Sequence, residues 1–146
     1  LMDRAFGPGR FARTAERLRE GNTLRADLSP VAVEGGEIVG ACRIWPLRIG
    51  RAPALYLGPF AVEDSRRRAG LGASLIGQAV AWARAAQEPA ILLIGDAPYF
   101  APLGFSIVPP GRVTMPGPVD PARVLWIALQ PGALERLAGS ATVPRD

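Results

Sequence analysis

The chain has 146 residues with 17 basic and 13 acidic side chains, and this length favours a single domain over residues 1–146 that folds around one core. Cys42 is the single cysteine and histidine is absent, which excludes internal disulfides, the histidine-based triads and most zinc sites, so we expect no metal. No apolar run approaches the roughly 20 residues of a membrane span and no signal-peptide pattern is present, so we expect a cytoplasmic protein without a membrane partner.

The first predicted elements are a helix and a hairpin. A helix is predicted over Phe11–Glu20, where charged residues lie on one face and apolar residues on the other. Strands follow over Pro30–Glu34 and Glu37–Leu47, and Gly35-Gly36 between them predicts a hairpin turn. A second turn is predicted over Arg48–Pro53.

The third predicted strand, Ala54–Val62, contains Gly58-Pro59 in its interior. Proline donates no hydrogen bond to a β-ladder, so a strand tolerates it only at a bulge or where the pairing is interrupted. Both flanks are strongly apolar, which favours an interrupted strand over the alternative of two short strands at a bend.

A helix over Gly70–Ala86 and a strand over Ala90–Gly95 come next. The apolar stripe of this helix consists of Leu71, Leu75, Ala79, Trp82 and Ala86, widened by Ile76, Val80 and Ala83. The continuous apolar run AILLIG is typical of a strand that is covered on both faces. Strand, helix and strand therefore predict a βαβ unit with parallel strands and a right-handed crossover.

The last third of the chain predicts short elements. Pro98–Pro102 suits a short helix, and Phe105–Val108 with Arg123–Leu129 suits a closing antiparallel pair. We expect the tail, Ser140–Asp146, to be loose. The predicted fold class is a mixed α/β sheet, without internal repeats or a linker to a second domain.

The segment that precedes the long helix joins three arginines to two closely spaced glycines, in the sequence VEDSRRRAGLGASL. The first amides of a helix lack internal partners and lie at the positive end of its dipole, so a phosphate placed there accepts several N–H bonds. Because Gly70 and Gly72 have no Cβ, a phosphate can approach their backbone. Arg67 and Arg68 add cationic donors. A solvated charge cluster before a turn is the alternative, but it leaves unexplained two glycines that cost the helix up to about 1 kcal/mol each.

All 17 basic residues are arginines, which suits the codon usage of a GC-rich bacterial genome or a preference for anionic ligands. The positive net charge raises nucleic acid as a partner, but the arginines are scattered and do not interleave with aromatic residues, so we expect no nucleic acid partner. A P-loop needs a lysine and is excluded. A dinucleotide site stays an alternative, because Gly70–Leu75 has two of the three glycines of that fingerprint and Asp96 follows the next strand.

Three segments in this order resemble the GCN5-related N-acetyltransferase (GNAT) superfamily. Arg67-Arg68-Ala69-Gly70-Leu71-Gly72 matches its Q/R-x-x-G-x-G/A signature. The longer run LGPFAVEDSRRRAGLGASLI resembles its central strand, pyrophosphate loop and following helix, and GDAPYFAPLGF resembles its Y-x-x-x-GF region. The closing MPGPVDPARVLWIALQPGAL resembles the YhbS-like branch of predicted acetyltransferases, so the resemblance covers nearly the whole chain.

This resemblance implies the acyl-CoA N-acyltransferase fold, in which the interrupted strand and its parallel neighbour splay apart around acetyl-CoA as co-substrate. Backbone groups of Phe60, Ala61 and Val62 would be unpaired there and bind the pantetheine arm, while amides from Arg68 to Ala73 would hold the pyrophosphate. The implied cofactor-binding residues are Phe60, Ala61, Val62, Arg67, Arg68, Ala69, Gly70, Leu71, Gly72, Ala73 and Phe100. The implied reaction is direct attack of a primary amine on the thioester.

The chain departs from the family's pattern in two places. The family places a strand before the first helix, whereas this sequence starts at Leu1 next to that helix, so we expect the first strand to be missing. The family's usual acid is a tyrosine four residues before the glycine of GF, where this chain has Phe100. The neighbouring Tyr99 is the candidate general acid, with a packing role as the alternative. Asp96 is the candidate base, with a helix cap as the alternative.

The sequence therefore predicts an N-acetyltransferase that uses acetyl-CoA and acts on an unidentified amine. A non-catalytic acyl-CoA-binding module is the first alternative, and Phe100 is the reason for it. A dinucleotide-binding protein is the second. The resemblance also implies that a homodimer is a frequent assembly for such a protein.

Overall fold

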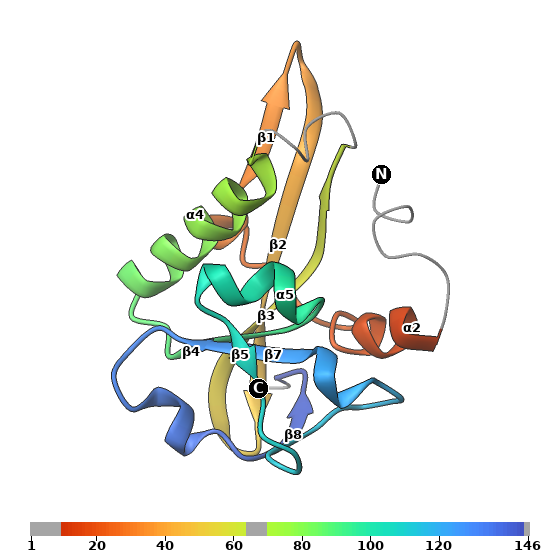
Figure 1. Ribbon diagram of the computed structural model, residues 1–146, viewed down its shortest axis with the longest axis vertical. Coiled ribbons are helices and arrows are strands. Elements are labelled where there is room, and N and C mark those ends of the chain that lie inside the picture. The colour runs from red at the N-terminus through yellow and green to blue at the C-terminus, as the bar shows by residue number, and fades with distance from the viewer. Residues whose placement is uncertain (1–9, 64–69, 145–146) are drawn as a thin grey trace.

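The computed structural model describes residues 10–63 and 70–144, and for residues 10–13 it describes the backbone alone. The helices are α2 (Arg10–Arg17), α4 (Leu71–Ala85) and α5 (Ala97–Phe100), with the 3-10 helices η1 (Ala26–Leu28), η2 (Ala101–Leu103), η3 (Pro121–Arg123) and η4 (Ala133–Arg136). The strands are β1 (Val31–Glu34), β2 (Glu37–Ile49), β3 (Ala52–Val62), β4 (Ala90–Ile94), β5 (Ser106–Ile107), β6 (Val113–Thr114), β7 (Val124–Ala128) and β8 (Gly139–Thr142). Within the described residues they form one mixed sheet in the order β5-β7-β4-β3-β2-β8-β6, with β1 also paired to β2 (Figure 1).

The long strand β2 holds one half of the sheet together. Residues 40–49 of this strand pair with β3, residues 37–41 pair with β1, and Arg48 and Ile49 pair with β8. The predicted hairpin turn between β1 and β2 is confirmed, because Gly35 and Gly36 both have positive φ angles, 59° and 84°, that glycine adopts without strain. The β1–β2 hairpin projects beyond the rest of the sheet (Figure 1).

Two sequence predictions about this half of the sheet are wrong. The turn predicted over Arg48–Pro53 narrows to Gly50 and Arg51, because β2 and β3 continue on both sides of it. The tail predicted to be loose contains β8, which pairs with the end of β2 and in parallel with β6. This strand is stabilised by partners far away in the sequence and not by its own composition, so a local pattern does not reveal it.

The interruption predicted at Gly58-Pro59 is confirmed. The parallel ladder between β3 and β4 consists of three pairs and ends at Leu57 opposite Leu93. On the other side of β3, the register with β2 shifts between Cys42 and Ile44, so that Gly58-Pro59 forms a bulge in the ladder. The indole N–H of Trp45 donates a hydrogen bond to the Gly58 carbonyl, which holds the bulged backbone in place.

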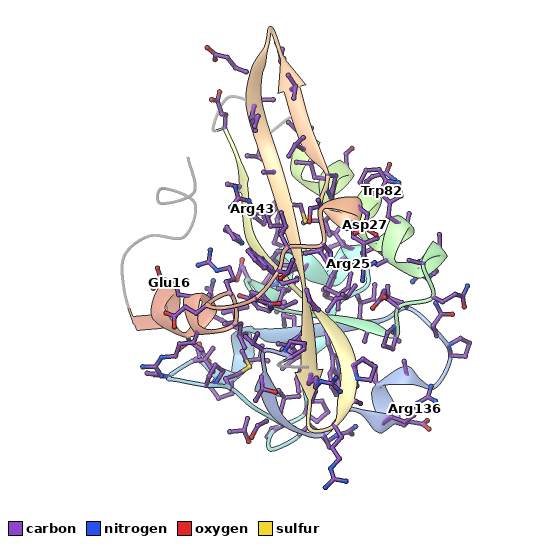
Figure 2. The ribbon with its side chains drawn as sticks, turned by 180° about the vertical axis from the view of Figure 1, so that it is seen from behind. Glu16, Arg25, Asp27, Arg43, Trp82 and Arg136 are labelled. Atoms are coloured by element: carbon purple, nitrogen blue, oxygen red, sulfur yellow. The ribbon has the colours of Figure 1, made fainter. Side chains whose placement is uncertain are left out.

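Apolar side chains cover both faces of the sheet, in agreement with the continuous apolar runs of β3 and β4. Successive residues of β3 alternate between the faces: Leu55 and Leu57 pack on the side of α4, while Ala54 and Tyr56 pack on the side of α2. The buried residues of α4 are Gly72, Leu75, Ile76, Ala79, Val80 and Ala83. The predicted apolar stripe of this helix is thus correct at its centre. The assignment of Trp82 to the buried face is wrong, because its side chain is 41% exposed and points away from the sheet (Figure 2).

Arg25 connects the segment before β1 to the end of α4. Its guanidinium forms ion pairs with Asp27 at 3.0 Å and with Glu88 at 3.2 Å, and its backbone amide donates to Ile44. Arg25 and Asp27 lie next to each other in the view from behind (Figure 2). The hydrogen bonds from Arg25 hold the pKa of the Asp27 carboxyl below its usual value.

In the part of the chain that the structure describes, no helix is long and apolar enough to cross a membrane. The same residues contain no group of three or more histidine, cysteine, aspartate or glutamate side chains in an arrangement that could hold a metal ion.

Candidate active site

A cavity of about 390 Å³ lies where β3 and β4 separate, next to the N-terminus of α4 and to α5. It is lined by Leu57, Phe60, Ala61, Val62, Gly72, Leu93, Ile94, Gly95, Asp96, Tyr99, Phe100 and Arg123. Its position follows from the interrupted strand, because β3 keeps its pairing with β2 after the bulge while β4 keeps its pairing with β7. Two parallel strands that no longer pair with each other leave room between them.

The backbone of β3 turns polar groups toward this cavity. The amide of Glu63 donates to the carbonyl of Val39 at 2.9 Å, which makes these two residues a hydrogen-bonded pair of the β2–β3 ladder. Bonded and non-bonded pairs alternate along an antiparallel ladder, so Ala61 bonds to Ala41 while the amide and carbonyl of Phe60 point away from β2. The prediction that Phe60, Ala61 and Val62 are all unpaired is therefore wrong for Ala61, and for Phe60 the register shows that its backbone groups point away from β2.

The first turn of α4 contributes Gly72 to the cavity lining and places further amides beside it. Gly70 is the N-cap and lies in the left-handed region with φ 76° and ψ 12°, a conformation that glycine adopts without strain. The first backbone bond of the helix runs from the Ser74 amide to the Gly70 carbonyl at 3.1 Å. The amides of Leu71, Gly72 and Ala73 therefore have no acceptor within the helix, and they lie at the positive end of its dipole.

Gly72 lies close to the aromatic side chains of the cavity lining. A Cβ on Gly72 would lie 2.5 Å from the hydroxyl oxygen of Tyr99 and 3.0 Å from Cζ of Phe60. A Cβ on Gly70, in contrast, would have nothing within 4 Å, so the glycine at this position is explained by its φ angle and not by crowding. The two glycines of the signature thus have different physical roles.

Aromatic side chains form one wall of the cavity. Phe100 is buried and packs edge to face on Phe105 with 5.7 Å between ring centroids, so it belongs to the core on the α4 side of the sheet. Tyr99 is 44% exposed, and its ring lies 4.9 Å from that of Phe100 and 6.3 Å from that of Phe60. Of the two candidate positions for a general acid, Tyr99 therefore places a hydroxyl at the cavity, while Phe100 contributes an apolar surface.

Asp96 lies between β4 and α5. Its backbone carbonyl accepts hydrogen bonds from the amides of Tyr99 and Phe100 at 3.0 and 3.1 Å, whereas its side chain makes no capping hydrogen bond. The carboxylate is exposed and belongs to the cavity lining. The alternative that this side chain is present to cap a helix finds no support in the geometry.

Arg123 lines the same cavity and was not identified from the sequence. It directly precedes β7, and the amide of Gly95 donates to its carbonyl at 2.9 Å. The signal that could have found it is the pairing of β4 with β7, because an antiparallel neighbour starts where β4 ends. Sequence reasoning predicted the β5–β7 pair and did not place β7 beside β4.

The remaining predicted cofactor-binding residues fall into two groups. Gly70, Leu71 and Ala73 form the start of α4 and are not among the residues that line the cavity. Arg67, Arg68 and Ala69 lie outside the described residues. The apolar floor formed by Leu57 and Leu93 was not predicted as part of a site.

A mixed sheet with a parallel pair that separates beside a helix N-terminus is the arrangement that the resemblance to acyltransferases implied, and it differs from the continuous parallel sheet of dinucleotide-binding proteins. The chain belongs to the acetyltransferase (GNAT) family, whose model matches residues 2–102. A search of curated proteins found no match.

Solved structures agree with this assignment. The fold is similar to that of the GNAT family N-acetyltransferase YhbS from Escherichia coli in complex with CoA, with a TM-score of 0.76, 20% identity, and coverage of 91% of this chain and 74% of that one. A GNAT family acetyltransferase from Brucella melitensis in complex with acetyl-CoA has a TM-score of 0.63, 26% identity, and coverage of 90% and 74%. Tetrahymena GCN5 has a TM-score of 0.52 and 17% identity over 70% of this chain and 68% of its own.

Proposed function

We propose that this acetyltransferase moves the acetyl group of acetyl-CoA to a primary amine by direct attack of the amine on the thioester. The observation that carries the proposal is the cavity between β3 and β4, whose lining includes Gly72 of the first turn of α4, the carboxylic acid Asp96 and the phenol Tyr99. The similar Brucella protein was solved with acetyl-CoA. Acetyl-CoA is therefore the co-substrate that fits this site best.

The first turn of α4 would hold the diphosphate. The amides of Leu71, Gly72 and Ala73 have no acceptor within the helix and lie at its positive end, an arrangement that binds phosphate oxygens. Arg67 and Arg68 would add charge-assisted hydrogen bonds from the preceding segment. The pantetheine arm would then run along Phe60, whose backbone amide and carbonyl point away from β2.

The reaction needs one nitrogen–carbon bond to form and one carbon–sulfur bond to break. In the proposed step the amine attacks the thioester carbonyl, and a backbone amide of β3 at Phe60 stabilises the negative oxygen. Asp96 accepts the proton that the amine nitrogen loses, directly or through water, and Tyr99 donates a proton to the departing CoA thiolate. Both side chains line the cavity, so each can reach a ligand within it.

One observation favours a second candidate function, a module that binds acyl-CoA without turnover. Phe100 occupies the position of the family's usual acid and is buried in the core, where its ring can donate no proton. Activity then depends on Tyr99. Release of free thiol from acetyl-CoA in the presence of a panel of primary amines separates the two functions, because the module binds CoA and releases no thiol.

Thermal unfolding with acetyl-CoA, CoA or NAD tests the binding site itself. Ligand at about 100 times its dissociation constant stabilises the folded state by about 2.7 kcal/mol. We expect acetyl-CoA and CoA to raise the melting temperature and NAD to leave it unchanged. Stabilisation by NAD without stabilisation by CoA would overturn the proposal.

A further inference from the structure

We propose that the acceptor is a small zwitterion, an amine that carries a carboxylate on a neighbouring carbon as α-amino acids do, and that Arg123 binds this carboxylate. The inference rests on the proposed function and names the substrate class of the same cavity. It assigns Arg123 a specificity-determining role, beside the proton-accepting role proposed for Asp96.

The first observation is that one anionic and one cationic residue, Asp96 and Arg123, are neighbours in the cavity lining. Asp96 follows β4 and Arg123 precedes β7, and the hydrogen bond from the Gly95 amide to the Arg123 carbonyl fixes the two segments next to each other. The cavity lining contains no other charged side chain, and its remaining surface comes from apolar, aromatic and glycine residues within the described part of the chain.

The second observation is that the described part of the fold does not use these two charges. Among the described side chains, the ion pairs are those that Arg25 makes with Asp27 and Glu88. Within the same residues, neither Asp96 nor Arg123 makes a side-chain hydrogen bond, and they do not pair with each other. Arg112, by contrast, is bound to the carbonyls of Leu134 and Leu137, as expected for an arginine with a structural role.

The opposite charges of Asp96 and Arg123 then favour an acceptor that carries both an amine and a carboxylate. A zwitterion satisfies both side chains, with its amine next to Asp96 and its carboxylate in a charge-assisted and bidentate contact with the Arg123 guanidinium. A polyamine brings a second cation toward Arg123 and is repelled, and a simple alkylamine leaves the guanidinium without a partner. An acid without an amine has no nucleophile.

Phosphate groups of CoA are the other anions that could reach Arg123. The proposed phosphate site at the start of α4 lies at Leu71–Ala73. Arg123 instead lies opposite Gly95, the residue directly before the proposed base Asp96. The observations therefore favour the acceptor carboxylate, and measuring the affinities for CoA and for the acceptor separately distinguishes the two anions.

The experiment uses matched probes that differ only in the carboxylate. The pairs are L-leucine with isopentylamine, L-methionine with 3-(methylthio)propylamine, and L-phenylalanine with phenethylamine. Binding of each probe to the CoA-saturated protein is measured by calorimetry at pH 7.5, and acetyl transfer by thiol release. We expect at least one amino acid to bind ten times or more tighter than its amine, and to be acetylated with a correspondingly lower KM.

Variants of two exposed arginines test the role of Arg123 in binding the carboxylate. Arg123→Met should remove the preference for the amino acid and leave the affinity for CoA unchanged, and Arg123→Glu should reverse the preference. Arg136→Met is the matched control, because Arg136 lies on η4 (Figure 2) and is not among the residues that line the cavity, so this variant should behave as the unmodified protein.

Three results would overturn the inference: no amino acid bound more tightly than its amine, a preference that survives in Arg123→Met, or a loss of CoA affinity in that variant larger than the loss of amino-acid affinity. Failure of the proposed function is distinguishable, because it appears in the unmodified protein as the absence of stabilisation by acetyl-CoA and CoA.

Discussion

Gly72 is the residue at which the first turn of α4 meets the aromatic wall of the cavity. A side chain there would reach the hydroxyl of Tyr99 and the ring of Phe60 before it reached solvent. We expect Gly72→Val to weaken CoA binding at least tenfold, because the added methyl groups push Tyr99 aside and enter the space next to the helix amides. Calorimetric titration of the variant with CoA measures this effect.

Gly77 provides the control for this substitution. It lies on the same helix, is exposed, and has nothing within 4 Å of an added Cβ, so Gly77→Val repeats the chemical change without the crowding. CoA affinity should be unchanged in this variant. Equal affinities in the two variants would count against a ligand at the start of α4.

The residues of the candidate site were predictable to different degrees. The glycine signature and the interrupted strand each break a local rule of helix or strand composition, and such breaks are visible in a sequence. The aspartate after β4 breaks no such rule, since it also suits a helix cap. Arg123 breaks no rule, since an arginine before a strand is ordinary, and its relevance arises when β7 pairs with β4. The same holds for the buried position of Phe100, which depends on Phe105 across a turn.

At the scale of elements, periodicity predicted the parts of the fold that have strong local patterns. The long helix and the two strands around it lie within one or two residues of their predicted bounds. The strand β8 has a short and mostly exposed sequence, so its existence depends on the free edge that β2 offers. The exposure of Trp82 has a similar cause, because the sheet accepts the small residues Ala79 and Ala83 at close distance and thereby sets which side of α4 is buried.

The docking of α2 depends on a buried hydroxyl. Thr14 is fully buried, and its hydroxyl donates to the Pro118 carbonyl at 2.6 Å. We expect Thr14→Val to lower the free energy of unfolding by about 1–3 kcal/mol, because the carbonyl loses its buried partner while the volume of the side chain is kept. Urea unfolding followed by tryptophan fluorescence measures the loss.

Thr23→Val is the matched control for the docking of α2, since Thr23 is exposed and its side chain makes no hydrogen bond among the described contacts. Its free energy of unfolding should stay within about 0.5 kcal/mol of the unmodified protein. Equal losses in the two variants would show that the Thr14 hydroxyl contributes nothing specific.

At the scale of the whole molecule, stability should depend on pH in an unusual range. Burial raises the pKa of the Cys42 thiol to about 12 and also raises the pKa of the Tyr56 phenol, with Arg19 partly opposing the latter shift. In the unfolded chain these groups titrate near 9.0 and 10.0. The unfolded state therefore releases protons first as the pH rises, and the folded state loses stability above about pH 9.

The absence of histidine sharpens this prediction, because no side chain with an ordinary pKa titrates between pH 6 and 8. We expect a constant free energy of unfolding across that range and a decline above pH 9 of up to about 1.4 kcal/mol per pH unit for each of the two groups. Denaturant unfolding from pH 6 to 11 measures the profile. Cys42→Ala should remove the thiol's share of the decline, and a slope already present between pH 6 and 8 would contradict the assignment.

The three pairs between β3 and β4 have a consequence for the mechanics of the protein. These pairs join two halves of the sheet, one built on β2 and the other on β7, and the pairing ends where the cavity begins. A cofactor in the cavity would replace the missing contacts between β3 and β4, and it would connect the two halves of the sheet beyond the end of the pairing. Cofactor binding would then make the sheet stiffer. The backbone hydrogen bonds between β3 and β4 should therefore open transiently in the protein without cofactor and stay closed when the cofactor is bound.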